Sequence, residues 1–265
     1  MIEPEILALS PAINIKSVPC IAKTQSIFIY LKNKIWYKFY LFLKCQKVSN
    51  DKYNIFVEPK KKIIYLIRHG ETNFNTDPVP RVRGRIDVPL NDLGILHAKQ
   101  AGEFLKDENI GKIYYSKIPR AKHTAEKIAE MHSTKVELVE EPLVIDISWG
   151  DWEGKTYKEA FGAEDGGNYF KAPEKLMVPN GETFYCVMDR LRKFLERFWL
   201  SDEEVCTIAS HGTVTNCFGL LIMQSPISQF WTMYMSGCGV SKIIMKGIDK
   251  FQIDYWNAHH FLKDK

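Results

Sequence analysis

Two short apolar runs of the chain each end in a polar residue followed by a His-Gly pair. The first run, at 63–67, continues into Arg68-His69-Gly70, and the second, at 205–209, continues into Ser210-His211-Gly212. Apolar runs of this length that stop at glycine favour buried strands of a parallel sheet. Ligands of such sheets bind beyond the carboxyl ends of the strands. Both histidines are therefore predicted to lie where a binding site would form.

Segments with helical and strand periodicity alternate along the rest of the chain. Asn91 can cap one helix, Pro119 can begin a second, and a third spans the strongly apolar face from Val187 to Phe198. The expected inner residues of the first two helices are Gly94, Ala98, Ala101, Leu105, Ala121, Ala125 and Ile128. Further strands are expected at 113–115, 136–139, 240–245 and 251–255. This order predicts an α/β fold, a three-layer α/β/α sandwich with a mostly parallel central sheet.

The composition changes abruptly near residues 58–62. Residues 1–62 contain 11 lysines and 4 acidic residues but no arginine, glycine or histidine. The remaining residues contain 25 basic and 28 acidic side chains, so the net charge of +4 comes from the N-terminal segment. The main body is mildly acidic, which argues against a nucleic-acid partner. We expect an N-terminal extension of uncertain status at 1–61 and one catalytic domain at 62–265.

Residues 26–45 are rich in aromatic residues and lysine, and three interpretations of them are open. They could contact an anionic membrane surface, form an extra packed element or a disordered arm, or belong to an upstream extension outside the working protein. The apolar runs here are too short for a transmembrane helix. No basic, apolar secretory signal follows Met1, and the 6 cysteines include no C-x-x-C pair. These features favour reduced thiols and a cytoplasmic protein.

Arginine is rare in this chain and is concentrated around the first His-Gly pair. Eight of the 36 basic residues are arginines, which leaves 28 lysines. Arg68 precedes His69, three more arginines follow at 81, 83 and 85, and Arg120 lies at the start of a predicted helix. A guanidinium binds two phosphate oxygens at once, and the N–H groups of a helix start also attract anions. The pattern predicts a phosphate-binding site.

The order and spacing of the motifs resemble the histidine phosphatase superfamily, in its phosphoglycerate mutase-like branch. The resemblance runs from about 62 to 260. It rests on Arg68-His69-Gly70-Glu71-Thr72-x-x-Asn75, Arg81-x-x-Gly84-x-x-Asp87-x-Pro89-Leu90-x-x-x-Gly94, Ser116-x-x-x-Arg120-Ala121-x-x-Thr124-Ala125, Trp149-Gly150-x-Trp152-Glu153-Gly154-x-Thr156, Asn180-Gly181-Glu182-Thr183 and Ser210-His211-Gly212. A single R-H-G triplet is a weak signal, but the ordered set is specific.

The resemblance implies a role for each matched side chain. His69 would be the nucleophile that takes the phosphoryl group. The substrate phosphate would be bound by Arg68, Arg120 and His211, with help from Asn75. The family uses a glutamate as proton donor at the position of Asp146, which is one methylene shorter, so Glu153 and Glu182 are kept as alternatives. The resemblance implies no metal and no cofactor.

The segment around Trp149 resembles the phosphatases of the family more than its glycolytic mutases. It predicts a metal-independent phosphatase that hydrolyses monoesters of a small phosphorylated metabolite through a phosphohistidine on His69. A mutase that depends on a bisphosphoglycerate cofactor and a non-catalytic phosphate-binding or scaffold protein are the alternatives. The stretch 157–180, with Tyr157, Phe161, Tyr169, Phe170 and Lys171, is expected to cap the pocket and set its specificity.

Overall fold

The computed structural model describes residues 60–162 and 167–264. The expected N-terminal extension, with its aromatic segment 26–45, lies almost entirely outside the described residues, so its three interpretations stay predictions. No helix in the described ranges has the length and apolar character needed to cross a membrane.

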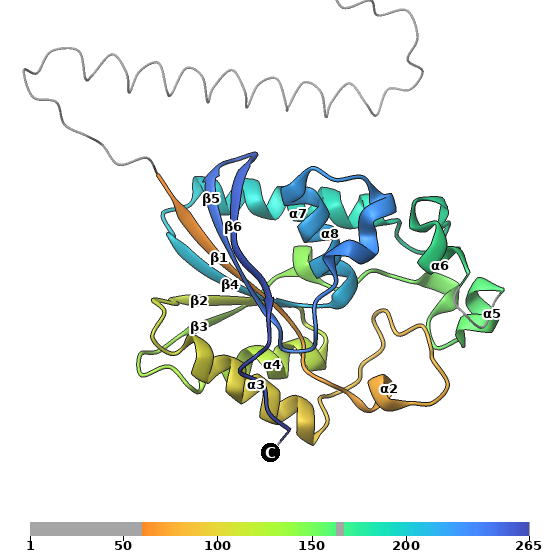
Figure 1. The fold of residues 1–265 in the computed structure, drawn as a ribbon, viewed down its shortest axis with the longest axis horizontal. Helices are drawn as coiled ribbons and strands as arrows, with labels where there is room; N and C mark the ends of the chain where they lie inside the picture. The colour runs from red at the N-terminus through yellow and green to blue at the C-terminus, as the bar shows by residue number, and fades with distance from the viewer. Residues whose placement is uncertain (1–59, 163–166, 265) are drawn as a thin grey trace, which may run out of the picture. The chain divides into compact units, whose positions relative to one another are not determined.

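A six-stranded sheet with the order β3-β2-β4-β1-β5-β6 forms the centre of the described chain (Figure 1). Its strands are β1 (Lys62–Arg68), β2 (Lys112–Tyr115), β3 (Glu137–Glu140), β4 (Val205–Ser210), β5 (Val240–Gly247) and β6 (Lys250–Ala258). The first four run parallel, whereas β5 runs antiparallel to both β1 and β6. The mostly parallel sheet expected from the sequence is confirmed.

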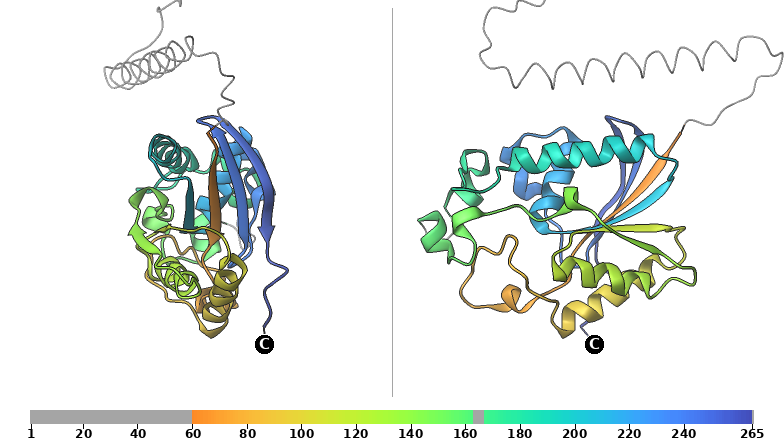
Figure 2. Two further views of the ribbon diagram at one scale, coloured as in Figure 1. Left: turned by 90° about the vertical axis from the view of Figure 1, so that its left-hand side faces the viewer. Right: turned by 180° about the vertical axis from the view of Figure 1, so that it is seen from behind.

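Helices cover both faces of this sheet (Figures 1 and 2). Alternate side chains of β1 point to opposite faces. Ile64 and Leu66 join the apolar core beneath α7 (Phe184–Leu200) and α8 (Gly212–Met223). Tyr65 and Ile67 join a second core beneath α3 (Asp92–Leu105) and α4 (Pro119–Ala129). The three-layer sandwich is therefore confirmed.

The predicted helix starts are found at the expected residues. Asn91 Oδ1 accepts a hydrogen bond from the Gly94 amide at 2.8 Å, and Pro119 is the first residue of α4. Gly94 also permits a close backbone approach, because a Cβ at this position would lie 2.1 Å from the Glu71 carbonyl oxygen. The start of α3 therefore packs directly against the loop that follows β1, and this contact holds that loop in place.

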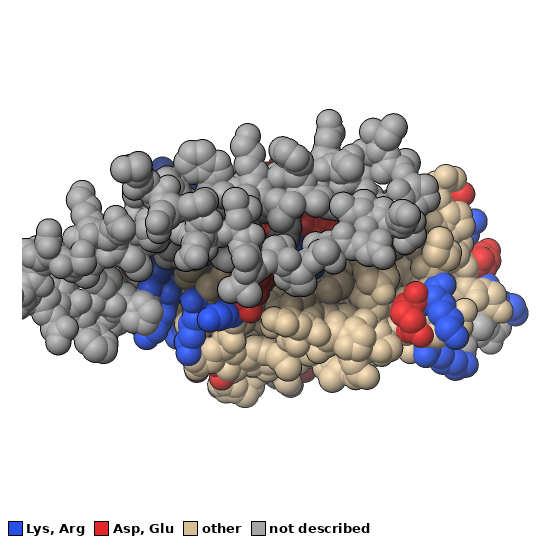
Figure 3. Space-filling model, turned by 90° about the horizontal axis from the view of Figure 1, so that it is seen from above, with Lys and Arg blue, Asp and Glu red and all other residues tan. Residues whose placement is uncertain are grey.

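Short elements complete the described chain. They are α2 (Asn73–Thr76), η1 (Pro142–Val144), η2 (Gly150–Trp152), α5 (Tyr157–Phe161), α6 (Asn168–Lys171), η3 (Pro173–Lys175) and η4 (Ile227–Met233). Helices α5 and α6 lie together beyond one end of the sheet in Figure 1 and in the right-hand view of Figure 2. On the face shown in Figure 3, the visible charged side chains of the described residues lie in small separate groups.

Candidate active site

Pairing of β1 with β4 brings the two His-Gly pairs together. Arg68 is in register with Ser210, and the His69 amide donates to the Ser210 carbonyl oxygen at 2.8 Å. The two imidazole rings that follow lie with their centroids 5.3 Å apart. His69 and His211 therefore lie side by side at the carboxyl ends of two neighbouring strands.

The partners of His69 fix which ring nitrogen carries its proton. Nδ1 lies 2.7 Å from the Gly70 carbonyl oxygen, which can only accept, so Nδ1 carries the proton. Nε2 lies 3.2 Å from the Nε–H of Arg120, which can only donate, so Nε2 presents its lone pair. Burial and the charges of Arg120 and Arg68 hold the pKa of His69 well below its usual value. The ring is thus neutral, with Nε2 available as a nucleophile.

Arg120 is almost fully buried in the first turn of α4, where four acceptors hold its guanidinium. Besides His69, it donates to the Ile86 carbonyl oxygen at 2.9 Å, to the Gly84 carbonyl oxygen at 2.7 Å and to Asp146 Oδ2 at 2.9 Å. Gly84 has a φ of 51°, a conformation that glycine adopts without strain. The loop before α3 therefore positions this arginine against the nucleophile.

Asp146 follows η1 and is buried beside both Arg120 and His211. Its Oδ1 accepts from the Ile147 amide at 2.9 Å, and its Oδ2 lies 3.5 Å from His211 Nδ1. Burial raises the pKa of Asp146, although the neighbouring Arg120 opposes this shift. A bound phosphate dianion would raise the pKa further by like-charge repulsion. The carboxyl group is thus suited to holding a proton near a bound phosphate.

Two buried nitrogens beside His69 have no hydrogen-bond partner among the described residues: Arg68 Nε and His211 Nδ1. The remaining groups of these side chains are engaged, because Arg68 donates to the Met235 carbonyl oxygen at 2.7 Å and His211 Nε2 lies 2.8 Å from Ser116 Oγ. Buried polar atoms without partners are rare in folded proteins. An anion with several oxygens at His69 would offer an acceptor to the N–H of Arg68 Nε, and to His211 Nδ1 where that nitrogen carries the proton.

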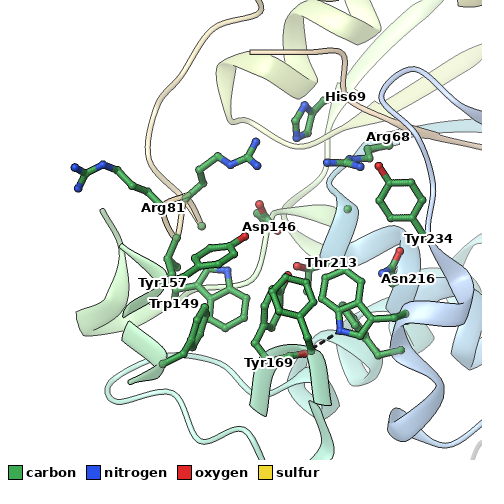
Figure 4. A pocket seen from close by; sticks show the side chains of 18 of the residues that line it. Arg68, His69, Arg81, Asp146, Trp149, Tyr157, Tyr169, Thr213, Asn216 and Tyr234 are labelled. Carbon is green, nitrogen blue, oxygen red and sulfur yellow. Dashed lines mark hydrogen bonds between the residues drawn. The ribbon is translucent and has the colours of Figure 1, made fainter. Parts of the chain in front are cut away.

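Arg68, His69, Arg120 and Asp146 line a cavity of about 240 Å³, which Figure 4 shows, whereas the buried His211 is not among its lining residues. Arg68 and His69 lie at one end, Trp149, Tyr157 and Tyr169 lie at the other, and Asp146 lies between them (Figure 4). The residues that line the cavity are Arg68, His69, Arg81, Val82, Arg83, Gly84, Arg120, Asp146, Trp149, Tyr157, Phe161, Tyr169, Phe170, Gly212, Thr213, Asn216, Phe230, Trp231 and Tyr234. The volume suits a small molecule.

The structure does not bring every predicted residue to this cavity. Asn75 is exposed in α2, where its Oδ1 accepts from Thr72 N at 3.0 Å and from Thr72 Oγ1 at 2.8 Å, so its phosphate-binding role stays a prediction. Glu153 Oε1 accepts from the Arg85 and Trp149 amides at 3.2 and 3.1 Å. Glu182 pairs with Arg85 at 3.0 Å. Neither glutamate is among the cavity-lining residues, whereas Asp146 is.

The stretch 157–180 contributes Tyr157, Phe161, Tyr169 and Phe170 to the cavity, as expected, but Lys171 is not among the lining residues. Sequence reasoning missed the contribution of η4, whose Trp231 Nε1 donates to the Tyr169 carbonyl oxygen at 2.9 Å. It also assigned no site role to Arg83 or Asn216. The cluster of arginines at 81–85 was a signal for Arg83, but no recognised motif marks η4.

Within the described ranges, no group of three or more His, Cys, Asp or Glu residues is arranged to hold a metal ion.

The neutral state of His69 ties the stability of the fold to pH. Below about pH 6.5 the unfolded chain protonates this histidine while the folded protein does not, so stability falls as pH falls, by up to about 1.4 kcal/mol per pH unit. The free energy of unfolding, measured with urea at pH 6.5 and 5.5, should fall more between the two pH values in the wild type than in His69→Gln. Asp146, whose pKa shifts in the opposite direction, is present in both proteins. Equal losses would contradict a neutral His69.

Comparison with known proteins assigns this arrangement to a family. The profile of the histidine phosphatase superfamily (branch 1) matches residues 64–259. Phosphoserine phosphatase 1 of Hydrogenobacter thermophilus is 29% identical over 189 residues, 69% of this chain and 86% of that protein. The metal-independent phosphoserine phosphatase of Arabidopsis thaliana is 32% identical over 174 residues, 64% of this chain and 72% of that protein. The structure of Bacillus stearothermophilus YhfR is 26% identical with a TM-score of 0.69, covering 76% of this chain and all of that one. The chain therefore belongs to the histidine phosphatase superfamily, branch 1.

Proposed function

We propose that the protein hydrolyses phosphate monoesters in two steps through a phosphohistidine on His69. In the first step, the lone pair of His69 Nε2 forms a bond to phosphorus while the bond from phosphorus to the alcohol oxygen breaks. Arg68, Arg120 and His211 stabilise the negative charge on the three oxygens of the transferred group. The observation that carries this proposal is the buried, neutral His69 beside two buried nitrogens that have no hydrogen-bond partner among the described residues.

Asp146 completes this scheme as the proton carrier. In the first step its carboxyl proton passes to the departing alcohol oxygen. In the second step the carboxylate takes a proton from water, the water oxygen binds phosphorus, and the bond to His69 Nε2 breaks. Its burial, its raised pKa and its place on the cavity wall support this role, whereas Glu153 and Glu182 are engaged in bonds outside the cavity.

The same residues could serve a mutase, which returns the phosphoryl group to a substrate instead of to water. We expect the protein alone to release inorganic phosphate from an aryl phosphate when no bisphosphoglycerate is present. Steady-state phosphate release, followed with and without added 2,3-bisphosphoglycerate, separates the two activities. If turnover is seen only with the bisphosphate, the protein is a mutase. If neither condition gives turnover over a broad panel of esters, the scaffold alternative holds.

We further propose that the substrate is a small phosphorylated metabolite handled in the cytoplasm. The cavity of about 240 Å³ supports a substrate of this size. The matched relatives named phosphoserine phosphatases make phosphorylated amino acids reasonable members of the first panel. The four cysteines of the described chain are free thiols, which suits a reducing compartment.

A further inference from the structure

The guanidinium of Arg83 is a charge without a partner in the part of the chain that the structure describes. Arg83 lines the cavity and is half-buried, yet it forms no side-chain hydrogen bond or ion pair with the described residues. Its neighbours differ, because Arg81 donates to the Gly154 carbonyl oxygen and Arg85 donates to the Asp146 carbonyl oxygen, both at 3.1 Å. A partly buried cation without a counter-charge is costly to the fold.

The surroundings of Arg83 increase this cost. Burial lowers the pKa of Arg83, and the positive charge of Arg68 lowers it further. The next residue, Gly84, accepts a hydrogen bond from Arg120, so the backbone ties Arg83 to the phosphate end of the cavity. Tyr157 and Asp146 also lie near Arg83, and their interactions oppose this shift by raising its pKa. Arg83 is thus held between the reacting phosphate and the wall where the alcohol part of a substrate would lie.

The charges that line the cavity do not balance when only one phosphate is bound. Among the described residues, four arginines line it, at 68, 81, 83 and 120, against one carboxyl group, that of Asp146. With Asp146 protonated, as the first proposed step requires, a phosphate dianion offsets two of the four positive charges. The aromatic residues described in the opposite wall, Trp149, Tyr157 and Tyr169, carry no negative charge. The remaining excess of positive charge lies at Arg81 and Arg83, and an anion would neutralise it.

We propose that Arg83 binds a second anionic group on the alcohol part of the substrate, and so selects esters that carry a carboxylate or a second phosphate. This inference rests on the proposed function, because it assigns part of the same cavity to the leaving alcohol. A guanidinium fits either group, since both offer two oxygens in one plane to its paired N–H groups. A leaving alcohol that carries only a cation is disfavoured by the same excess of positive charge.

The test compares substrates that differ only in the second anionic group. One pair is 3-phosphoglycerate and glycerol 3-phosphate, which differ in a carboxylate. The other pair is 1,3-propanediol bisphosphate and 3-hydroxypropyl phosphate, which differ in a second phosphate. kcat/KM for phosphate release is measured for both pairs, and for nitrophenyl phosphate, with the wild type, Arg83→Gln, Arg83→Lys and the control Arg192→Gln. Arg192 is exposed on α7 and pairs with Asp189 at 2.8 Å.

We expect the wild type to favour the anionic member of at least one pair by about 10- to 100-fold, the value of one charge-assisted contact. Arg83→Gln should abolish this preference by lowering kcat/KM for the anionic member alone. Arg83→Lys should keep part of the preference, and Arg192→Gln should keep all of it. A preference in just one of the two pairs also supports the proposal, and that pair shows whether the second group is a carboxylate or a phosphate.

Three outcomes would overturn the inference. A wild type that hydrolyses nitrophenyl phosphate but shows no preference in either pair would leave the proposed function intact and remove the second anion. If Arg83→Gln lowers kcat/KM equally for both members of each pair, Arg83 binds the transferred phosphate instead. Absence of turnover for every ester would remove the proposed function, and the inference with it. Thermal unfolding of each variant confirms that the substitutions leave the fold intact.

Discussion

Replacing His69 by alanine is expected to lower the rate of phosphate ester hydrolysis by at least about 10⁴-fold. The substitution removes Nε2, the atom that accepts the phosphoryl group in the proposed first step. The arginines around the site would still bind phosphate, so binding of inorganic phosphate should survive. Steady-state phosphate release from an aryl phosphate measures the loss, and isothermal titration with phosphate measures the binding.

A matched control for this variant is His97→Ala. His97 lies in α3, 3.3 Å from Asp264 and away from the cavity-lining residues. His97 is half-buried but lies outside the cavity, so the control should retain turnover within about threefold of the wild type if the fold is kept, which thermal unfolding checks. Wild-type activity in His69→Ala would show that another group takes the phosphoryl group.

The second large effect is expected at Asp146, and it should depend on the leaving group. An alkoxide needs a proton as it departs, whereas a nitrophenolate is stable without one. General acid catalysis contributes about 10²- to 10⁴-fold. Asp146→Asn should therefore slow the single-turnover hydrolysis of an alkyl phosphate by that factor, and slow phosphoryl transfer from nitrophenyl phosphate much less.

The two steps must be separated to interpret this variant. Water attack on the phosphohistidine can also need the carboxylate, so a burst of nitrophenol followed by slow turnover is expected in Asp146→Asn. Glu153→Gln and Glu182→Gln are the controls, because both glutamates are engaged in bonds with Arg85. If Asp146→Asn slows both substrates equally, or if a glutamate variant shows the leaving-group dependence, Asp146 is not the proton donor.

Much of the site could be predicted because it is encoded locally. A strand that ends in His-Gly puts its histidine at the carboxyl edge of the sheet whatever the rest of the chain does. Asn91 and Pro119 mark helix starts through their own hydrogen-bonding chemistry and backbone geometry. The closeness of His69 and His211 also depends on the parallel pairing of β1 with β4. The similarity of the two buried strands made that pairing a reasonable expectation.

Other features depend on contacts between distant segments. Helix α8 was not predicted, since its residues are apolar on nearly all sides and show no amphipathic period, as in a helix buried between layers. The antiparallel direction of β5 follows from how the chain returns after η4, which no local pattern specifies. Asn75 matches a family motif, but its side chain accepts from Thr72 at the start of α2. The role proposed for Arg83 depends on the absence of a partner among the described residues and on the charges around it, which no local sequence pattern shows.

The most direct test of this account is rapid-quench labelling with a substrate that carries radioactive phosphorus. We predict that the wild type forms a protein-bound phosphate that is labile to acid and stable to base, at a rate no slower than turnover. Peptide mapping should place the label on His69, and His69→Ala should show none. A label on another residue, or one that forms more slowly than product appears, would contradict the phosphohistidine mechanism.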